Sequence, residues 1–274
     1  MENKITLECE RDVAYDSLDH KMPWGTRRDN SKNSRFNKRL FDLFTENEYT
    51  YDKEKKANTS TLRIVSVLDL GCSGGGFVKT VIDEGHLAVG LEGSDYSKRM
   101  KRAEWAVIPE FLFTCDVTGD FKLSLDGKPM KFDAVTSWEV MEHIPEKGLP
   151  KMIENVKSHL NEGGIWIMSV ANWHDVVNGV DLHQSVHEKS WWINLMKEHG
   201  LEYLPEHVKY FNTQFVRGKY ETEKDFHLIV TNNKDKAPKI PKKGFKSRIG
   251  WNAMDHWVGS KPQKVLRMIT GRND

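Results

Sequence analysis

The feature that most constrains the fold of this chain is the glycine-rich stretch SVLDLGCSGGGFV at residues 66–78. An apolar run precedes the glycines and an amphipathic stretch follows them, which predicts a buried strand that turns into a helix. Asp69 stands two residues before the first glycine, where its carboxylate would repel the pyrophosphate of a dinucleotide. The G-x-G-x-x-G spacing also fails, because Ser73 occupies the second glycine position. The stretch therefore predicts a site that favours a positively charged ligand over a phosphate.

Strands and helices alternate on both sides of this loop. Strands are predicted at 62–70, 87–92, 110–116, from 132 onward and at 165–172, and helices at 75–85, 94–105, 148–164 and 185–200. A capping box of Ser185 and Glu188 is expected to start the last helix, and Gly200 to end it. Two further strands are predicted at 206–218 and 225–233. The pattern predicts an α/β fold: a doubly wound, mostly parallel, seven-stranded Rossmann-like sheet with an antiparallel edge pair.

The composition fits one such domain, because 274 residues with 38% apolar side chains provide a sizeable core. We place an N-terminal extension and linker at residues 1–61, with a helix over 34–44 and a polar loop over 45–61. The α/β domain is expected to span residues 62–233. A basic C-terminal tail over 234–274 completes the chain.

The cysteine pattern and the absence of a long apolar run indicate where the protein works. Cys9, Cys72 and Cys115 are scattered and show neither a disulfide framework nor a metal-binding spacing, which favours a reducing compartment. The N-terminus is charged and unlike a signal peptide. No apolar run approaches the roughly 20 residues that span a bilayer. We expect a cytoplasmic protein.

Charge is balanced in total but unevenly distributed. The net charge is +1, yet residues 21–40 and residues 234–248 each hold seven Lys or Arg against one Asp. Clusters of this kind can bind phosphates, acidic sugars or nucleic acid, or can form a solvated surface. Both interpretations stay open at this point.

Acidic residues recur where the predicted parallel strands end. Besides Asp69, Glu92 ends the second strand, Asp116 the third, and Glu139 follows the fourth. In open α/β sheets a ligand binds at the carboxyl ends of the strands, and a carboxylate about 20 residues beyond the glycine loop is spaced to bind ribose hydroxyls. An adenosine compound with a positive centre and no phosphate, such as S-adenosylmethionine, suits this set.

With these motifs in hand, the stretch from about residue 62 to 200 resembles the class I S-adenosylmethionine-dependent methyltransferases, especially the small-molecule and glycan branch. The resemblance rests on VLDLGCSGGG, VGLEGS, FTCDVTG and FDAVTSWEVMEHI. It implies S-adenosyl-L-methionine as cofactor, with Glu92 on the ribose and Asp116 on the adenine. The cofactor-binding residues that it implies are Asp69, Gly71, Ser73, Gly75, Glu92, Asp116, Val117, Ser137 and Trp138. Ser73 departs from the family, which usually has glycine at that position.

The loop after the fifth predicted strand is rich in groups that can serve a methyl acceptor. In similar enzymes a histidine before the next helix faces the substrate, and His183 holds that place. We therefore predict His183 as general base, followed by His174, with Glu139 as a further catalytic candidate. The predicted substrate-binding residues are Trp24, Thr26, Arg27, Asn30, Asn172 and His187.

The acceptor is expected to be a polar small molecule or glycan unit methylated on oxygen, and Arg27 and Arg28 suit a phosphorylated one. No metal is expected, because Asn172 and Asp175 lack an evident third ligand after the fifth strand. Two other functions remain open. One is an RNA or cap methyltransferase that uses the basic clusters and stacks bases on Trp251 and Trp257; the other is a non-catalytic scaffold that retains the cofactor site.

Overall fold

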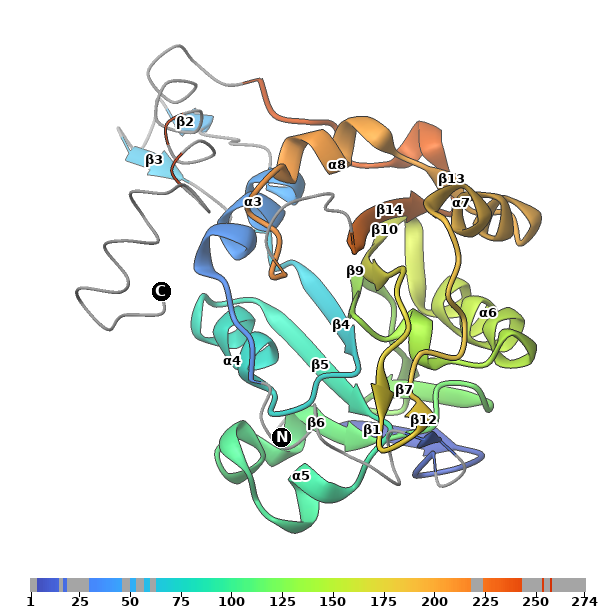
Figure 1. Ribbon diagram of the computed structural model, residues 1–274. Helices are drawn as coiled ribbons and strands as arrows, with labels where there is room; N and C mark the ends of the chain where they lie inside the picture. The colour runs from blue at the N-terminus through green and yellow to red at the C-terminus, as the bar shows by residue number, and fades with distance from the viewer. Residues whose placement is uncertain are drawn as a thin grey trace.

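The protein is described by a computed structural model, shown in Figure 1. The described residues are 4–14, 17–18, 30–45, 50–52, 57–59, 63–217 and 224–242, with the single positions 253 and 257. Among them, no helix combines the length and the apolar character that crossing a membrane requires.

A seven-stranded sheet forms the centre of the molecule. Its strand order is β13 (Glu202–Tyr203), β14 (Asp225–Thr231), β10 (Leu160–Ala171), β9 (Phe132–Trp138), β4 (Ser66–Leu70), β5 (Leu87–Glu92) and β6 (Leu112–Thr114). The neighbouring strands β10, β9, β4, β5 and β6 are all parallel to one another. Strand β14 is antiparallel to both of its neighbours, β10 and β13. The doubly wound, mostly parallel sheet with an antiparallel edge is therefore confirmed.

Helices cover the two faces of the sheet (Figure 1). The helices α3 (Ser34–Phe44), α4 (Gly76–Asp83) and α8 (Pro205–Phe211) pack on one apolar cluster, and α6 (Leu149–His159) and α7 (Lys189–Glu198) pack on the other. The predicted helix over 34–44 is confirmed, and the Asn33 side chain caps it by accepting hydrogen bonds from two backbone N–H groups. Each face thus buries one helical layer, as expected for an α/β fold.

Several local predictions were wrong, and residues 160–164, expected in a helix, belong to β10. The stretch 206–218 contains α8 instead of a strand, and Pro205 occupies its first turn. The helix expected over 94–105 shortens to α5 (Tyr96–Arg99) and a 3₁₀ turn, η1 (Ala103–Ala106), because Lys101 and Ala103 adopt positive φ angles. The Ser185 hydroxyl donates to the Ile144 carbonyl, so it caps no helix.

Part of the N-terminal segment joins the domain through a second, three-stranded sheet. Strand β1 (Ile5–Cys9) pairs antiparallel with β7 (Phe121–Leu125), which pairs with β8 (Lys128–Pro129). The Asp126–Gly127 turn between β7 and β8 has both φ angles positive, as in the tight turns that join antiparallel strands. Residues 50–52 and 57–59 form a small hairpin of β2 and β3 within the stretch predicted as a loop.

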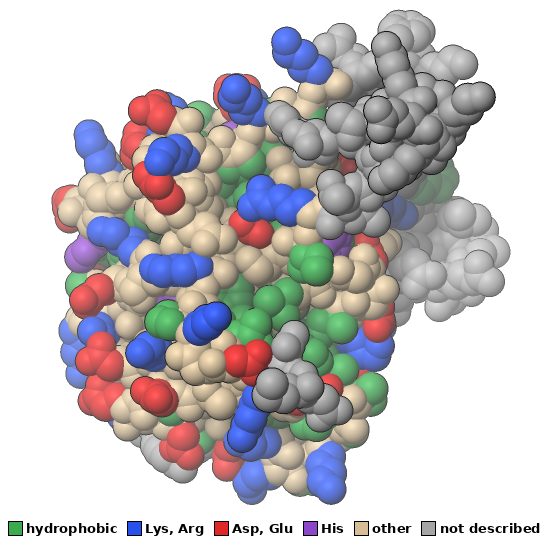
Figure 2. Space-filling model, turned by 180° about the vertical axis from the view of Figure 1, so that it is seen from behind, with side chains coloured by type: hydrophobic (Ala, Val, Ile, Leu, Met, Phe, Trp, Pro, Cys, Tyr) green, Lys and Arg blue, Asp and Glu red, His purple; other side chains and the backbone are tan. Residues whose placement is uncertain are grey.

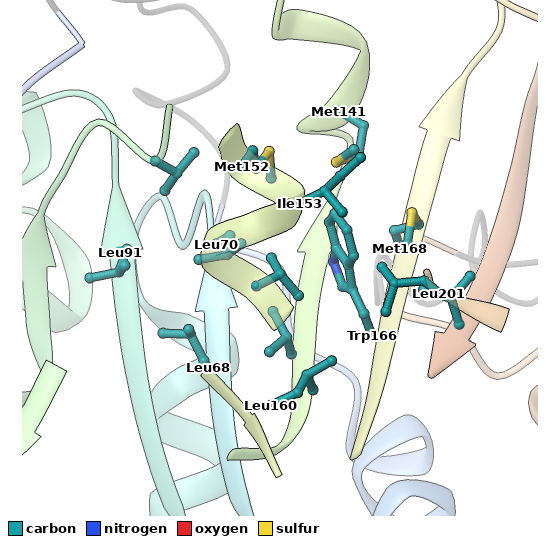
Figure 3. Packing of buried hydrophobic residues seen from close by; sticks show 14 of the residues in the cluster. Leu68, Leu70, Leu91, Met141, Met152, Ile153, Leu160, Trp166, Met168 and Leu201 are labelled. Atoms are coloured by element: carbon teal, nitrogen blue, oxygen red, sulfur yellow. The ribbon is translucent and has the colours of Figure 1, made fainter. Parts of the chain in front are cut away.

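The larger apolar cluster lies between the sheet and helices α6 and α7. In Figure 3 the Trp166 ring on β10 lies beside Ile153 of α6 and near Met168. Trp166, Ile153 and Met168 are all fully buried. This packing holds the carboxyl ends of β9 and β10 in place, and the site described next lies there.

Candidate functional site

A pocket of about 800 Å³ opens at the carboxyl ends of the parallel strands. The loops after β4, β5, β6, β9 and β10 line it. Arg11, Ala14 and Ser17, which follow β1 in the N-terminal segment, complete this side of the lining. Of the sequence-predicted residues, Gly71, Ser73, Glu92, Asp116, Val117, Trp138, Glu139 and His183 line it. The structure therefore brings six of the nine cofactor candidates, together with Glu139 and His183, to one cavity, as a site at the switch point of such a sheet requires.

The glycine loop is shaped by backbone geometry and by a close neighbour. Gly71 and Gly75 have φ angles of +73° and +83°, and a side chain at Gly71 would meet Val140 at 2.5 Å. Gly74 and Gly76 lie against Asn30, whose Oδ1 accepts a hydrogen bond from the Gly76 N–H at 2.7 Å. Asn30 thus closes the loop from the N-terminal segment but does not line the pocket.

Ser73 occupies the left-handed region at φ +48°, a conformation that costs a residue with a side chain about 1–2 kcal/mol. Its hydroxyl accepts a hydrogen bond from Arg102 at 2.9 Å, and its carbonyl accepts one from the Trp105 indole at 2.8 Å. These contacts hold the strained turn, so serine is accommodated where the family usually has glycine.

Asp69 is 2% exposed and lies behind the loop. Its Oδ1 accepts a hydrogen bond from the Thr136 hydroxyl at 2.6 Å, which ties β4 to β9. Asp69, Gly75 and Ser137 do not line the pocket. Their predicted contacts with the methionine part of the cofactor stay predictions.

Glu92 is held in a fixed position at the end of β5. One carboxylate oxygen accepts from the Ser73 N–H at 2.7 Å and the other from the Ser94 N–H at 3.0 Å. The side chain is nearly buried yet lines the pocket. The Glu92 carboxylate therefore presents its acceptor oxygens to the pocket in a fixed orientation.

Asp116 marks the far end of the pocket and is paired with a residue of the N-terminal segment. Its Oδ1 accepts hydrogen bonds from the Thr118 N–H and hydroxyl, and its Oδ2 lies 2.9 Å from the Arg11 guanidinium. Arg11 itself lines the pocket. Arg11 could not be predicted, because its position beside Asp116 depends on the pairing of β1 with a strand more than a hundred residues later.

Of the two neighbours Ser137 and Trp138, Ser137 supports the packing of the core and Trp138 lines the pocket. The Ser137 hydroxyl is fully buried and accepts a hydrogen bond from the Trp166 indole N–H at 3.0 Å. Trp138 lines the pocket, and its buried indole N–H has no acceptor among the described residues. A buried donor of this kind can be satisfied by a bound molecule.

We expect Ser137→Ala to lower the free energy of unfolding by about 1–3 kcal/mol, because the buried Trp166 N–H would lose its acceptor. Urea denaturation measures this loss. In a double-mutant cycle, Ser137→Ala should cost less in the Trp166→Phe background than in the wild type. Fully additive costs would show that the hydrogen bond does not contribute.

His183 lies at the other end of the pocket, where the loop after β10 folds back. Its Nδ1 contacts the Trp173 carbonyl at 2.5 Å, and the Trp173 ring meets the imidazole edge to face. Burial lowers the pKa of His183, so its imidazole is neutral near pH 7. Glu139 lines the same pocket and has a φ of +55°, a strained backbone of the kind found at functional sites.

The other predicted acceptor residues lie elsewhere or beyond the described chain. His174 pairs with Asp181 at 2.5 Å on the surface, and His187 pairs with Glu146 and stacks on Trp191. Neither these two histidines nor Asn172 lines the pocket. Trp24, Thr26, Arg27, Arg28 and Trp251 fall outside the described residues.

Further charged and metal-ligating residues lie at the site but were not among the predicted site residues. Arg217 and Lys224 add positive charge near the acceptor end, and Lys224 lies over the Trp173 ring at 5.3 Å. Glu142 and His143 follow β9 and lie close to His183. Burial raises the pKa of Glu142 to about 7.

Comparisons with known proteins identify a family for this chain. A family model described as a methyltransferase domain matches residues 26–217, more than half of the chain. A search of curated proteins finds no match.

Several solved structures are similar, each at low identity. One is a TehB-like SAM-dependent methyltransferase from Corynebacterium glutamicum, 17% identical, with a TM-score of 0.45, over 72% of this chain and 86% of that one. Another is magnesium protoporphyrin IX methyltransferase from Synechocystis PCC 6803 with bound SAH, 16% identical, with a TM-score of 0.42, over 63% of this chain and 76% of that one. The glycopeptide N-methyltransferase MtfA complexed with SAM is 13% identical, with a TM-score of 0.41, over 65% of this chain and 84% of that one.

Proposed function

Because the chain belongs to the methyltransferase domain family, we propose that it transfers a methyl group to an oxygen of a polar small molecule or glycan unit in the pocket described above. Its cofactor is S-adenosyl-L-methionine, which supplies an electrophilic methyl group on a sulfonium. The observation that supports this function best is that three strand-end carboxylates, of Glu92, Asp116 and Glu139, line one cavity.

The described residues fit the cofactor. We assign Glu92 to the ribose hydroxyls, since its carboxylate lines the pocket and its oxygens are fixed by backbone N–H groups. We assign Asp116 and Val117 to the adenine end, where Arg11 holds the carboxylate in place. The Trp138 indole N–H offers a donor that is unsatisfied among the described residues.

The acceptor end of the pocket suits a polar molecule that carries negative charge. Trp173, 39% exposed, offers an aromatic face, and Arg217 and Lys224 supply positive charge nearby. Guanidinium and ammonium groups bind phosphate or carboxylate groups through charge-assisted hydrogen bonds. A phosphorylated or acidic sugar would use all three features.

The distribution of charge on the face in Figure 2 supports a nucleic-acid acceptor less than it supports a small molecule. Over the described residues of that face, Lys and Arg side chains alternate with Asp and Glu. A nucleic-acid footprint would instead cluster positive charge. We therefore keep RNA as an outcome of the acceptor test.

The test is incubation of the full chain with methyl-labelled S-adenosylmethionine and a panel of neutral sugars, phosphosugars, acidic sugars and RNA oligonucleotides. We expect label in an acidic or phosphorylated sugar, at an oxygen, identified by mass spectrometry. Label in RNA, with steep salt dependence, would overturn the small-molecule acceptor. Cofactor binding without label in any acceptor would support a scaffold instead.

A further inference from the structure

The acceptor end contains a cluster of ligand-forming side chains that the sequence analysis did not bring together. Glu142, His143 and His183 each offer one ligand atom, and the three atoms lie within 4.8 Å of one another. His143 and His183 line the pocket. We propose that these three residues bind a divalent transition-metal ion that holds the hydroxyl oxygen of the acceptor.

Glu142 provides a carboxylate oxygen that lacks a hydrogen-bond partner. The side chain is fully buried, and its Oε1 accepts from the Ala171 N–H at 3.0 Å. Its Oε2 is buried and has no hydrogen-bond partner among the described residues. Since buried polar atoms are almost always satisfied, an orphaned carboxylate oxygen points to an absent partner. A cation beside the two imidazoles would be such a partner.

Both imidazoles are oriented as metal ligands usually are. The His143 Nδ1 contacts the Leu182 carbonyl at 3.2 Å, and the His183 Nδ1 contacts the Trp173 carbonyl at 2.5 Å. A carbonyl oxygen only accepts, so each Nδ1 must carry the hydrogen and each neutral ring has its lone pair on Nε2. A ligating histidine characteristically donates its other N–H to a carbonyl or carboxylate.

The backbone fixes the distance between the two segments that supply these residues. Glu142 lies in η3 (Met141–His143), which follows β9. His183 lies in the loop that leads from β10 to α7. The Glu142 carbonyl accepts from the Gln184 N–H at 2.7 Å and from the Ser185 N–H at 2.9 Å. The cluster is thus built by the fold and does not depend on flexible surface side chains.

The ligand set selects the class of ion. Ca²⁺ takes six to eight oxygen ligands, and Mg²⁺ prefers oxygen and water. Two imidazoles and one carboxylate suit Zn²⁺, Mn²⁺, Fe²⁺ or Co²⁺, and three protein ligands leave positions open for a substrate oxygen. The pocket lining gives the acceptor access to these positions.

The chemical consequence rests on the proposed function. A hydroxyl bound to the ion would have a lowered pKa, as metal-bound water does. Its O–H bond breaks, the electron pair stays on the oxygen, and the proton passes to the Glu139 carboxylate, which lines the same pocket. The oxygen is then nucleophilic, and His183 acts by holding the ion. A metal ion at this site would therefore favour oxygen as the atom that is methylated.

The test starts with metal-free full chain, prepared by chelation and titrated with Co²⁺ and, separately, with Zn²⁺. Visible absorption and calorimetry report binding without reference to activity. We expect one ion per chain, and loss of affinity in Glu142→Gln and in His183→Gln that exceeds the roughly 10–100-fold cost of altering an outer-shell partner. His187→Gln, which alters the surface pair with Glu146, should bind the ion as the wild type does.

Circular dichroism checks that the Glu142→Gln and His183→Gln proteins are folded. Binding of S-adenosylmethionine is measured with and without the ion. Failure to bind either ion, or equal affinity in all variants, would overturn the metal site. Methyl transfer that survives complete chelation would also overturn it and would leave His183 as the base of an intact proposed function. Ion binding that needs Glu142 and His183, in a protein that binds no cofactor, would support the site and refute the proposed function alone.

Discussion

Replacing Glu92 by alanine is expected to raise the dissociation constant for S-adenosylmethionine at least roughly 100-fold, which corresponds to about 2.7 kcal/mol. The carboxylate lies at the end of β5 with both oxygens held by backbone N–H groups, so it is preorganised for the ribose. Hydrogen bonds to an ionised acceptor are about twice as strong as neutral ones, and alanine removes the acceptor altogether. Isothermal titration calorimetry measures the change.

The matched control is Glu110→Ala, because Glu110 is an exposed carboxylate in η2 (Pro109–Phe111) outside the pocket. It should bind the cofactor as the wild type does. Circular dichroism must show that Glu92→Ala is folded, since its carboxylate also supports the glycine loop. A folded Glu92→Ala protein with unchanged affinity would remove Glu92 from the cofactor site.

His183→Gln is expected to lower kcat by roughly 100-fold or more once the acceptor is known. The imidazole lines the acceptor end of the pocket, and burial lowers its pKa so that it is neutral near pH 7. Glutamine retains polarity but cannot take up a proton and is a far weaker metal ligand. Because His183 is not among the residues assigned to adenine and ribose, cofactor affinity should change little.

Steady-state kinetics with saturating cofactor measure this effect, and His199→Gln is the control. His199 ends α7 outside the pocket, and its substitution should leave kcat unchanged. A His183→Gln enzyme with normal kcat would exclude this residue from the chemistry.

The sheet could be predicted from the sequence because each buried strand is a short apolar run followed by a glycine or an acidic residue. Strands β4, β5 and β9 are almost entirely buried, and such runs are hard to mistake when helices separate them. The cofactor end followed from the same logic, since residues at the carboxyl ends of parallel strands meet at one edge.

Elements whose structure depends on distant partners could not be predicted. Strand β1 alternates half-buried and exposed residues, but its partner β7 lies far later in the chain. Helix α8 was mistaken for a strand because aromatic and β-branched residues outweighed the helical spacing of Val208 and Phe211, which both face the core.

The acceptor end was predicted only in part for the same reason. His183 was found by its place before a helix, whereas its proximity to Glu142 depends on two backbone hydrogen bonds from residues 184 and 185. A local spacing rule cannot detect such a pair. The search for metal ligands after β10 therefore missed residues that follow β9.

The central claim is that the pocket binds a phosphate-free adenosine compound with a positive centre. Calorimetric titration of the purified full chain with S-adenosylmethionine and, in parallel, with NAD⁺ tests it most directly. We predict one tightly bound S-adenosylmethionine per chain and at least roughly 100-fold weaker binding of NAD⁺, because its pyrophosphate would enter a pocket that the carboxylates of Glu92, Asp116 and Glu139 line. Preference for NAD⁺, or no heat of binding with S-adenosylmethionine, would contradict the account.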